Sequence, residues 1–421
     1  MPHGQPVASF PQSTSRPALG EREFVAMMAL LQALQALAID AMLPAMGVIS
    51  HDLGGGDANN RQLVVGLFLL GAGLGALLPG TLADRFGRRP VVMVTLAIYV
   101  VTSLGCALVH DFQSLILLRF VQGFGCSGLA VLPPAIIRDR LDGDRMARLQ
   151  SLVSVVFMTV PMMAPALGQA ILLVANWRWI FIVIALLGIV MMIWTTLRLP
   201  ETLHPEFRQQ IRPRAIAINM GRVLTTRSSI GYVAGSALVM SAMWGFINSA
   251  QQLIAEHFGT GKAFPLVFAC LAFTMSVANF GNSRIVERFG ARRVSHTALL
   301  AYIGISSLQY LAANSEHEAL WQFAVLMGSN MCLMGFIGAN FTSIALQPFA
   351  EIAGAAASVQ TFLRMVTAST VGALIGQAYD GTARPIALAL LAAGLASLLA
   401  VLFSEKGRLF RRLNYPAKTA G

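Results

Sequence analysis

Three charged side chains lie inside long apolar segments of the chain: Asp40, Arg119 and Arg364. Asp40 is the only acid deep in any of these segments, because the other acids lie at segment ends, in loops or in tails. A charge at the centre of a helix surrounded by lipid costs ~2.5–3.5 kcal/mol, so such a residue is expected to have a function. Burial also favours the neutral form of a carboxylate. Asp40 is therefore predicted to take up and release a proton reversibly.

Each of the three charges also has a structural interpretation. Asp40 could form a permanent ion pair with Arg119 or Arg364 that holds helices together. Arg119 keeps its proton at accessible pH, and it could simply donate to backbone carbonyl groups. Arg364 has no acid near it in sequence, and its long side chain could extend to the cytoplasmic edge of the membrane. If both guanidinium groups stay inside, the interior is cationic and favours a bound molecule with a carboxylate, sulfonate or phosphate group.

The elements that position these charges must be membrane-spanning helices. Of the 421 residues, 56% are hydrophobic and only 12% are charged, and the mean hydropathy is +0.67. Ordinary soluble domains have about 45–50% apolar and about 25% charged residues, so a water-soluble protein is excluded. A span needs about 20 mostly apolar residues. Twelve such segments are expected, at residues 25–48, 62–82, 91–109, 113–137, 149–172, 178–198, 230–256, 263–283, 294–313, 319–346, 353–377 and 384–403.

The basic residues show which side of the membrane each loop occupies. Of 30 Lys and Arg residues, 24 fall on the side that holds both expected tails and the polar segment 199–229. The opposite side carries four: Arg61, Arg178, Lys262 and Arg384. Cytoplasmic loops are enriched in Lys and Arg, so both termini are predicted to be cytoplasmic. Because these charges are scattered over short loops, they do not indicate a nucleic-acid partner.

The polar segment 199–229 divides the expected spans into two sets of six. The predicted domains are a disordered cytoplasmic tail (1–22), a first bundle (23–198), a cytoplasmic linker (199–229), a second bundle (230–404) and a cytoplasmic tail (405–421). The loop after the second span, Asp84-Arg85-Phe86-Gly87, is echoed after the eighth by Glu287-Arg288-Phe289-Gly290, 203 residues later. A parallel duplication of six spans is the organisation of major facilitator transporters.

Short motifs from the first expected span onward resemble those of the major facilitator superfamily. The loop after span 2 carries its signature, Gly80-Thr81-Leu82-Ala83-Asp84-Arg85-Phe86-Gly87-Arg88-Arg89-Pro90. Two motifs look like those of its proton-coupled exporters: Leu118-Arg119-Phe120-Val121-Gln122-Gly123 and Ala164-Pro165-Ala166-Leu167-Gly168. Span 1, with Ile39-Asp40-Ala41-Met42-Leu43-Pro44-Ala45, is similar to drug:proton antiporters with twelve spans. Three further motifs resemble the bicyclomycin/chloramphenicol-resistance (Bcr/CflA) branch: Ile137-Arg138-Asp139, Trp177-Arg178-Trp179-Ile180-Phe181 and Leu199-Pro200-Glu201-Thr202-Leu203.

The resemblance implies an all-α integral membrane fold in the bacterial inner membrane, in which two pseudo-symmetric six-helix bundles surround a central cavity. It also implies a monomeric H⁺ antiporter that exports drugs or small metabolites by rocker-switch alternating access. The proton gradient would drive it, and no cofactor is expected. Asp40 and Arg119 would couple protons, and Asp84 would meet the N-terminal end of span 11. The residues expected to form gates or to allow conformational change are Gly80, Asp84, Arg85, Gly87, Arg88, Arg89, Pro161, Pro165 and Gly168.

Polar residues at membrane depth predict a binding pocket for a small amphiphilic molecule. The expected pocket residues are Gln32, Gln35, Met42, Gln122, Trp244, Asn248, Gln251, Asn330 and Arg364. Three positions depart from the family pattern: Met42 replaces a usual Tyr, Leu172 replaces a Gly, and Ala250-Gln251 replaces a Ser-Pro pair. These departures affect the inferred substrate more than the inferred fold.

Other functions share parts of this pattern. The chain could export one specific anionic metabolite, siderophore or amino-acid derivative, or it could be a passive facilitator or a proton symporter. Gly125-Cys126-Ser127-Gly128 matches the GxSG of intramembrane proteases, but all seven histidines fall in tails, loops or span ends, where they cannot serve as a base. An enzyme is therefore not expected. The four cysteines show no CxxC spacing, so no metal site is indicated.

Overall fold

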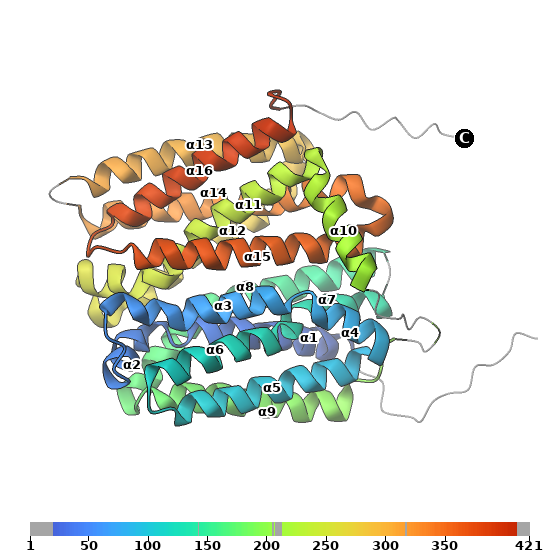
Figure 1. Cartoon of the computed structure of the whole chain (residues 1–421), viewed down its shortest axis with the longest axis horizontal. Coiled ribbons are helices and arrows are strands. Elements are labelled where there is room, and N and C mark those ends of the chain that lie inside the picture. Colours follow the sequence, from blue (N-terminus) through green and yellow to red (C-terminus); the bar gives the residue numbers. More distant parts are fainter. Residues whose placement is uncertain (1–19, 142, 204–205, 207–212, 316–317, 411–421) are drawn as a thin grey trace, which may run out of the picture.

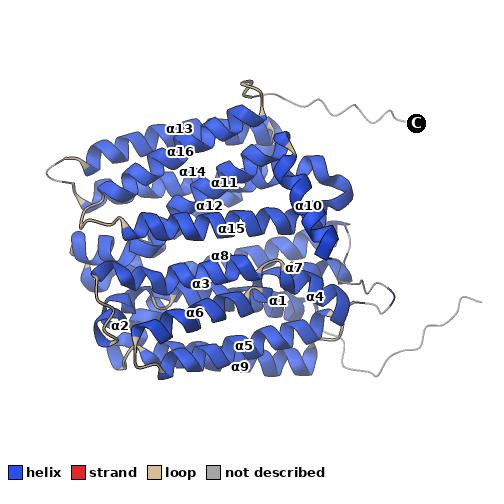
Figure 2. Cartoon of the chain, viewed as in Figure 1, coloured by secondary structure: helices blue, strands red, loops and turns tan. Residues whose placement is uncertain are grey.

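The computed structural model describes residues 20–141, 143–203, 206, 213–315 and 318–410. These residues form helices joined by loops and turns, with no β-strand among them (Figure 2). The predicted all-α class is therefore confirmed. Most of the two predicted tails, residues 1–19 and 411–421, lies outside the described residues.

The first half of the chain runs from α1 to α9. Its helices are α1 (Glu21–Asp40), η1 (Leu43–Ala45), α2 (Met46–Asp52), η2 (Ala58–Gln62), α3 (Leu63–Gly75), α4 (Leu78–Phe86), α5 (Arg88–Leu108), α6 (Phe112–Cys126), α7 (Gly128–Arg140), α8 (Gly143–Val174) and α9 (Arg178–Arg198). The second predicted span is broken, because α3 and α4 meet at an angle of 44°.

The second half runs from α10 to α16. Its helices are α10 (Pro213–Thr225), α11 (Arg227–Ala250), η4 (Gln251–His257), η5 (Gly261–Ala263), α12 (Phe264–Phe289), α13 (Ala291–Ala313), α14 (Leu320–Leu346), η6 (Gln347–Ile352), α15 (Ala353–Gln377) and α16 (Arg384–Ser404). The predicted linker thus contains a helix, α10, and α11 begins slightly before the predicted boundary. The segment η4 is a π-helix that continues α11 directly.

Local chemistry explains where several helices begin and end. Asp111 caps α6, because its Oδ1 accepts a hydrogen bond of 2.7 Å from the backbone N–H of Ser114. Gly87 separates α4 from α5, and Gly290 separates α12 from α13, with φ of 104° and 84°. Only glycine adopts such positive φ values without strain. The two loops that echo each other in sequence therefore turn in the same way.

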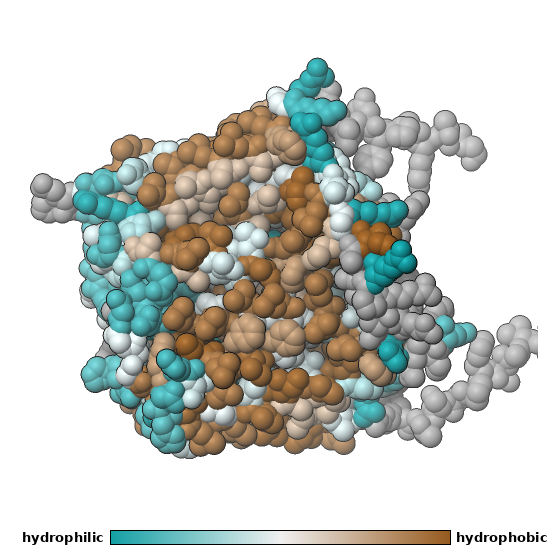
Figure 3. Space-filling model, viewed as in Figure 1, coloured by the Kyte–Doolittle hydropathy of each residue, from teal (hydrophilic) through white to brown (hydrophobic). Residues whose placement is uncertain are grey.

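Figure 3 shows a broad band of apolar surface across one face of the molecule. Hydrophobic residues cover the middle of the visible face, and hydrophilic residues gather at its two ends. Among the described residues, nine helices are long and apolar enough to cross a membrane, or ten if the bent pair α3–α4 counts as one span. The helices α13 and α15 do not reach that threshold, but they pack along α14 and α11. The predicted total of twelve spans therefore remains a prediction.

The helices form two packed groups that follow the two halves of the sequence (Figure 1). In the first group α3 packs on α6, α5 on α9 and α1 on α8. In the second group α11 packs on α15 and α16, and α14 packs on α12 and α13. The groups meet where α3 lies against α15 and where α8 lies against α12. Helix α1 begins and α16 ends on the same side of the molecule, at the right of Figure 1.

Small residues bring α3 unusually close to its neighbours. A Cβ atom on Gly123 of α6 would overlap the carbonyl oxygen of Phe68 in α3, and one on Gly71 would overlap the carbonyl oxygen of Phe120. Gly73 faces the other way, since a Cβ there would lie 3.0 Å from the backbone nitrogen of Val366 in α15. Close approach of this kind replaces the hydrophobic effect as a source of helix association in lipid.

Substitution of Gly123 with alanine tests this packing. The added Cβ meets backbone atoms that cannot rotate away, so we expect the Gly123→Ala variant to be destabilised by about 1–3 kcal/mol. The measurement is the melting temperature of the purified protein in detergent, which should fall by several degrees. Gly338→Ala in α14 is the matched control, because nothing lies within 4 Å of a Cβ at that position. Equal melting temperatures for the two variants would contradict the packing argument.

Candidate functional site

Asp40 is the last residue of α1, where the first span breaks before η1. Its exposed fraction is 5%, and in the described part of the chain its carboxylate makes no side-chain hydrogen bond and no ion pair. The permanent ion pair with Arg119 or Arg364 is therefore not formed in this structure. Asp40 is a buried carboxylate whose charge is not neutralised by a neighbouring cation.

The backbone beside Asp40 is in contact with α8. A Cβ on Gly168 would overlap the carbonyl oxygen of Ala41 and would lie 3.2 Å from Cγ of Pro44. Only a glycine allows α8 to lie this close to the break in the first span. The helix continues from Gly143 to Val174 through both Pro161 and Pro165. Residue 168, expected to belong to an exporter motif, thus contacts the segment that carries the unpaired acid.

Arg119 is fully buried inside the first half. Its Nε donates to the carbonyl oxygen of Val64 (3.1 Å), and its Nη1 donates to Oε1 of Gln122 (2.6 Å). Gln122 in turn donates to the hydroxyl of Ser103 (2.7 Å), and the ring of Phe68 lies 4.3 Å from the guanidinium carbon. These contacts fit the structural interpretation of Arg119, while the predicted coupling role stays a prediction.

A cavity of about 330 Å³ lies within the second half, between α11, α12, α14 and α15. Arg364 lines it, and Nη1 of this arginine donates to the hydroxyl of Thr342 (3.0 Å). The other lining residues are Ser236, Val239, Met240, Met243, Met275, Asn279, Met334, Gly335, Ile337, Gly338 and Ala339. The sequence reasoning did not single out most of its methionines. The only feature of the sequence that could have indicated a methionine-lined cavity is the high total of 20 Met residues.

The remaining predicted pocket residues lie outside this cavity. Gln32 and Gln35 lie on α1, half-buried and buried, and Met42 is fully buried beside them. Asn330 joins α14 to α13, because it accepts from Ser306 (3.0 Å) and donates to Gln309 (2.7 Å). Gln122 lies beside Arg119, Trp244 packs against the hydrophobic core, and Gln251 begins η4. Asn248 is buried, and neither its side-chain nitrogen nor its side-chain oxygen has a hydrogen-bond partner among the described groups.

A polar cluster joins the two halves at the end of the molecule where α2 lies, at the left of Figure 1. Arg61 makes a bidentate ion pair with Glu256 (2.7 and 2.8 Å). The side-chain amides of Gln62 and Gln252 are hydrogen-bonded (2.6 Å). We call this cluster the latch; its members are Asn59, Arg61, Gln62, Gln251, Gln252, Glu256, Gln377 and Tyr379. The sequence reasoning missed it, because its partners lie far apart in the chain.

The predicted gate loop makes its contacts inside the first half. Asp84 pairs with Arg88 (2.8 Å), and Nε of Arg88 donates to Asp139 (2.7 Å). The carboxylate of Glu201 accepts hydrogen bonds from the backbone N–H groups of Arg88 (2.8 Å) and Arg89 (3.2 Å), the first residues of α5. A negative charge is favoured at such a helix N-terminus.

The other predicted gate residues lie around these ion pairs. A Cβ on Gly87 would overlap the Glu201 carboxylate, and the guanidinium carbon of Arg85 lies 5.2 Å from the centre of the Phe86 ring. A Cβ on Gly80 would lie 3.9 Å from Cγ1 of Val131, an ordinary contact. The partner of Asp84 in this structure is thus Arg88, and the expected contact with span 11 remains a prediction for another conformation.

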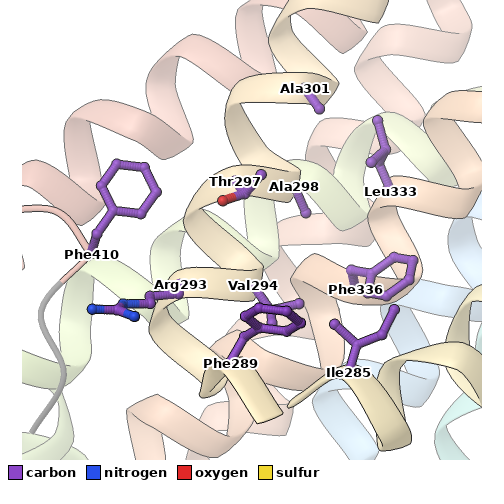
Figure 4. Close-up of a pocket in the computed structure, with 10 residues that line it drawn as sticks. All are labelled: Ile285, Phe289, Arg293, Val294, Thr297, Ala298, Ala301, Leu333, Phe336 and Phe410. Atoms are coloured by element: carbon purple, nitrogen blue, oxygen red, sulfur yellow. The ribbon is translucent and has the colours of Figure 1, made fainter.

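A larger hollow of about 670 Å³ lies on the outside of the second half (Figure 4). It is lined by Ile285 and Phe289 of α12, by one face of α13 and by Leu333 and Phe336 of α14, with Phe410 and Arg293 near one end. Ile285 and Phe289 are 40% and 48% exposed. None of the predicted site residues lines it. An apolar groove on the surface of a membrane-spanning bundle can be filled by lipid, so its size does not make it the substrate site.

Comparison with known proteins agrees with this geometry. The family model of the Major Facilitator Superfamily matches residues 28–376. A bicyclomycin resistance protein homolog of Haemophilus influenzae is 27% identical over 392 residues, covering 92% of this chain and 98% of that protein. The multidrug resistance protein MdtL of Klebsiella pneumoniae is 29% identical over 324 residues, covering 76% and 80%.

Solved structures share the fold. A bacterial homolog of the human lysosomal transporter Spinster, in an inward-facing and unoccupied conformation, superposes with a TM-score of 0.71 at 15% identity, covering 94% of this chain and 98% of that one. A D-xylose–proton symporter superposes with a TM-score of 0.70 at 15% identity, covering 91% and 96%. The resemblance seen in the sequence motifs is confirmed, and so is the expectation that the protein is not an enzyme. The chain belongs to the major facilitator superfamily of membrane transporters.

Proposed function

We propose that this protein is a proton-coupled exporter of small amphiphilic molecules that works by alternating access. The observation that carries the proposal is the unpaired, 5%-exposed carboxylate of Asp40 at the break in the first span. An ionised carboxylate without a partner is costly in an apolar interior. Asp40 is therefore expected to be neutral while it is buried and to ionise when water reaches it. A proton carrier needs this link between protonation and access to water.

The latch supports alternating access between two packed groups. It joins the halves at the end of the molecule away from the start of α1 and the end of α16. With the 24 basic residues of the opposite side in the cytoplasm, the latch lies on the periplasmic side, and the structure is closed there. Opening to the periplasm then requires Arg61 to leave Glu256, while the α3–α15 contact acts as the pivot.

The names of the relatives indicate the substrate class. Relatives named for bicyclomycin resistance and for multidrug resistance cover most of this chain, so we propose that drug-like molecules such as bicyclomycin are exported. The second candidate is export of a specific anionic metabolite, siderophore or amino-acid derivative, which Arg364 in the cavity favours. A passive facilitator of the same fold would not depend on Asp40, whereas a proton symporter would share the dependence on Asp40 and would differ in the direction of substrate transport.

The Asp40→Asn variant tests proton coupling. The amide has nearly the shape of the acid but cannot exchange a proton, so we expect the variant to fold and to lose gradient-driven export by at least about tenfold. The measurement is proton flux into proteoliposomes after bicyclomycin is added. Glu21→Gln, an exposed acid at the other end of α1, is the matched control and should transport normally. Unchanged flux in Asp40→Asn would exclude the proposed coupling.

Charge reversal tests the latch. Arg61→Glu places two acids together, so the closed arrangement should lose population, and Arg61→Glu combined with Glu256→Arg should restore it. Because the Glu256 side chain is 49% exposed, water screens the pair, and we expect an effect of about 1 kcal/mol, or about fivefold in population. Spin labels at His51 and His257, exposed residues of the two halves, report the distance across the latch. Identical distance distributions in all variants would show that the latch does not control closure.

A further inference from the structure

Arg364 is a cation that the described part of the protein leaves incompletely bound. Its Nη1 donates to Thr342 (3.0 Å), but Nε and Nη2 make no hydrogen bond with any described group, and no described acid pairs with it. Nε and Nη2 form one straight edge of the guanidinium. These two nitrogens are not among the fully buried atoms without a partner, and Arg364 lines the cavity, so this edge is the part of the guanidinium left for a ligand.

The position of Arg364 argues against extension of its side chain to the membrane edge. It lines a cavity together with residues from three other helices, and Thr342, which holds its Nη1, belongs to one of these, α14. A side chain that reached the lipid headgroups would instead lie along the surface of its own helix. The charge of Arg364 is thus directed into the interior of the second half.

The rest of the cavity lining is mostly apolar and contains few polar groups. Met240, Met243, Met275 and Met334 contribute flexible, polarisable side chains, which adapt to ligands of different shape. Ser236, Asn279 and Thr342 are the uncharged polar residues of the lining, and no acid is among the described residues that line it. The volume of about 330 Å³ lies at the small end of the range of ligand pockets, about 300–1,000 Å³.

We propose that this cavity binds small organic carboxylates with an apolar body, whose carboxylate is held by the Nε/Nη2 edge of Arg364. Two parallel N–H donors match the two oxygens of a carboxylate, and the pairing is geometrically specific. Thr342 fixes the guanidinium so that this edge faces the cavity, and the methionines enclose the apolar body. The assignment of this cavity as a transport site rests on the proposed export function, whereas binding itself does not require a proton gradient.

The test compares two probes of nearly equal shape, 1-naphthaleneacetate and its neutral amide 1-naphthaleneacetamide. Their dissociation constants are measured by titration calorimetry on the purified full-length protein in nanodiscs, with no gradient. Charge-assisted hydrogen bonds contribute about 1.5–3 kcal/mol, so we expect the carboxylate to bind about tenfold to a hundredfold more tightly than the amide. Arg364→Gln should abolish this preference and leave the affinity for the amide unchanged.

Two further variants test whether the carboxylate preference depends on the paired donors of Arg364. Arg364→Lys keeps the charge but not the paired donors, so we expect part of the preference to remain, and this variant also guards against misfolding of Arg364→Gln. Arg293→Gln, which removes an exposed arginine of the outer groove, should keep the full preference. Equal binding of the two probes to the parent protein, binding of neither, or a preference that survives in Arg364→Gln would each overturn the proposal. Loss of proton flux in Asp40→Asn is a separate measurement, so failure of the export mechanism would be recognised independently.

Discussion

The cost of placing a charge inside an apolar helical bundle distinguishes the three interior charges of this protein. Arg119 meets most of that cost with a carbonyl oxygen, a glutamine side chain and an aromatic ring inside the first half, although its Nη2 is buried with no hydrogen-bond partner among the described groups. Arg364 meets it in part, through Thr342. Asp40 has no such partner among the described groups, although it is 5% exposed. The more completely a charge is bound within one half, the less it can respond to a ligand, a proton or a movement between the halves.

The two halves repeat chemistry as well as topology. In the first half Glu201, just after α9, binds the N-terminal backbone of α5 next to Gly87. In the second half Glu405, just after α16, accepts a hydrogen bond from Arg292 (2.8 Å), two residues after Gly290. In both cases an acid that follows the last helix of a half (α9 or α16) is held near the start of an earlier helix of that half (α5 or α13). These contacts tie two helices of each half together at one end.

Composition and charge distribution were sufficient to predict the membrane class, and local motifs were sufficient to predict the family. Neither prediction requires knowledge of which distant residues meet in the folded chain. The site was less predictable, because burial and pairing depend on which helix faces which. Asn330 was expected in a pocket, yet its amide joins α13 to α14. Arg61 counted only as one cation on the sparsely charged side, although Glu256, its partner, lies 195 residues away. Asp40 was identified correctly as isolated in sequence, but only the structure could show that neither arginine pairs with it.

The contact between Gly168 and Ala41 gives this isolation a mechanical consequence. Helix α8 packs on α1 and on η1, next to Asp40, and it also packs on α12 of the other half. A side chain at residue 168 would separate α8 from the break in the first span. The absence of a Cβ at this position therefore allows α8 to pack closely against that break. In the proposed alternating access the halves move relative to each other, so α8 cannot stay fixed to both α12 and the first span. The segment that carries the unpaired carboxylate is therefore in direct contact with an element that must adjust whenever the interface between the halves changes.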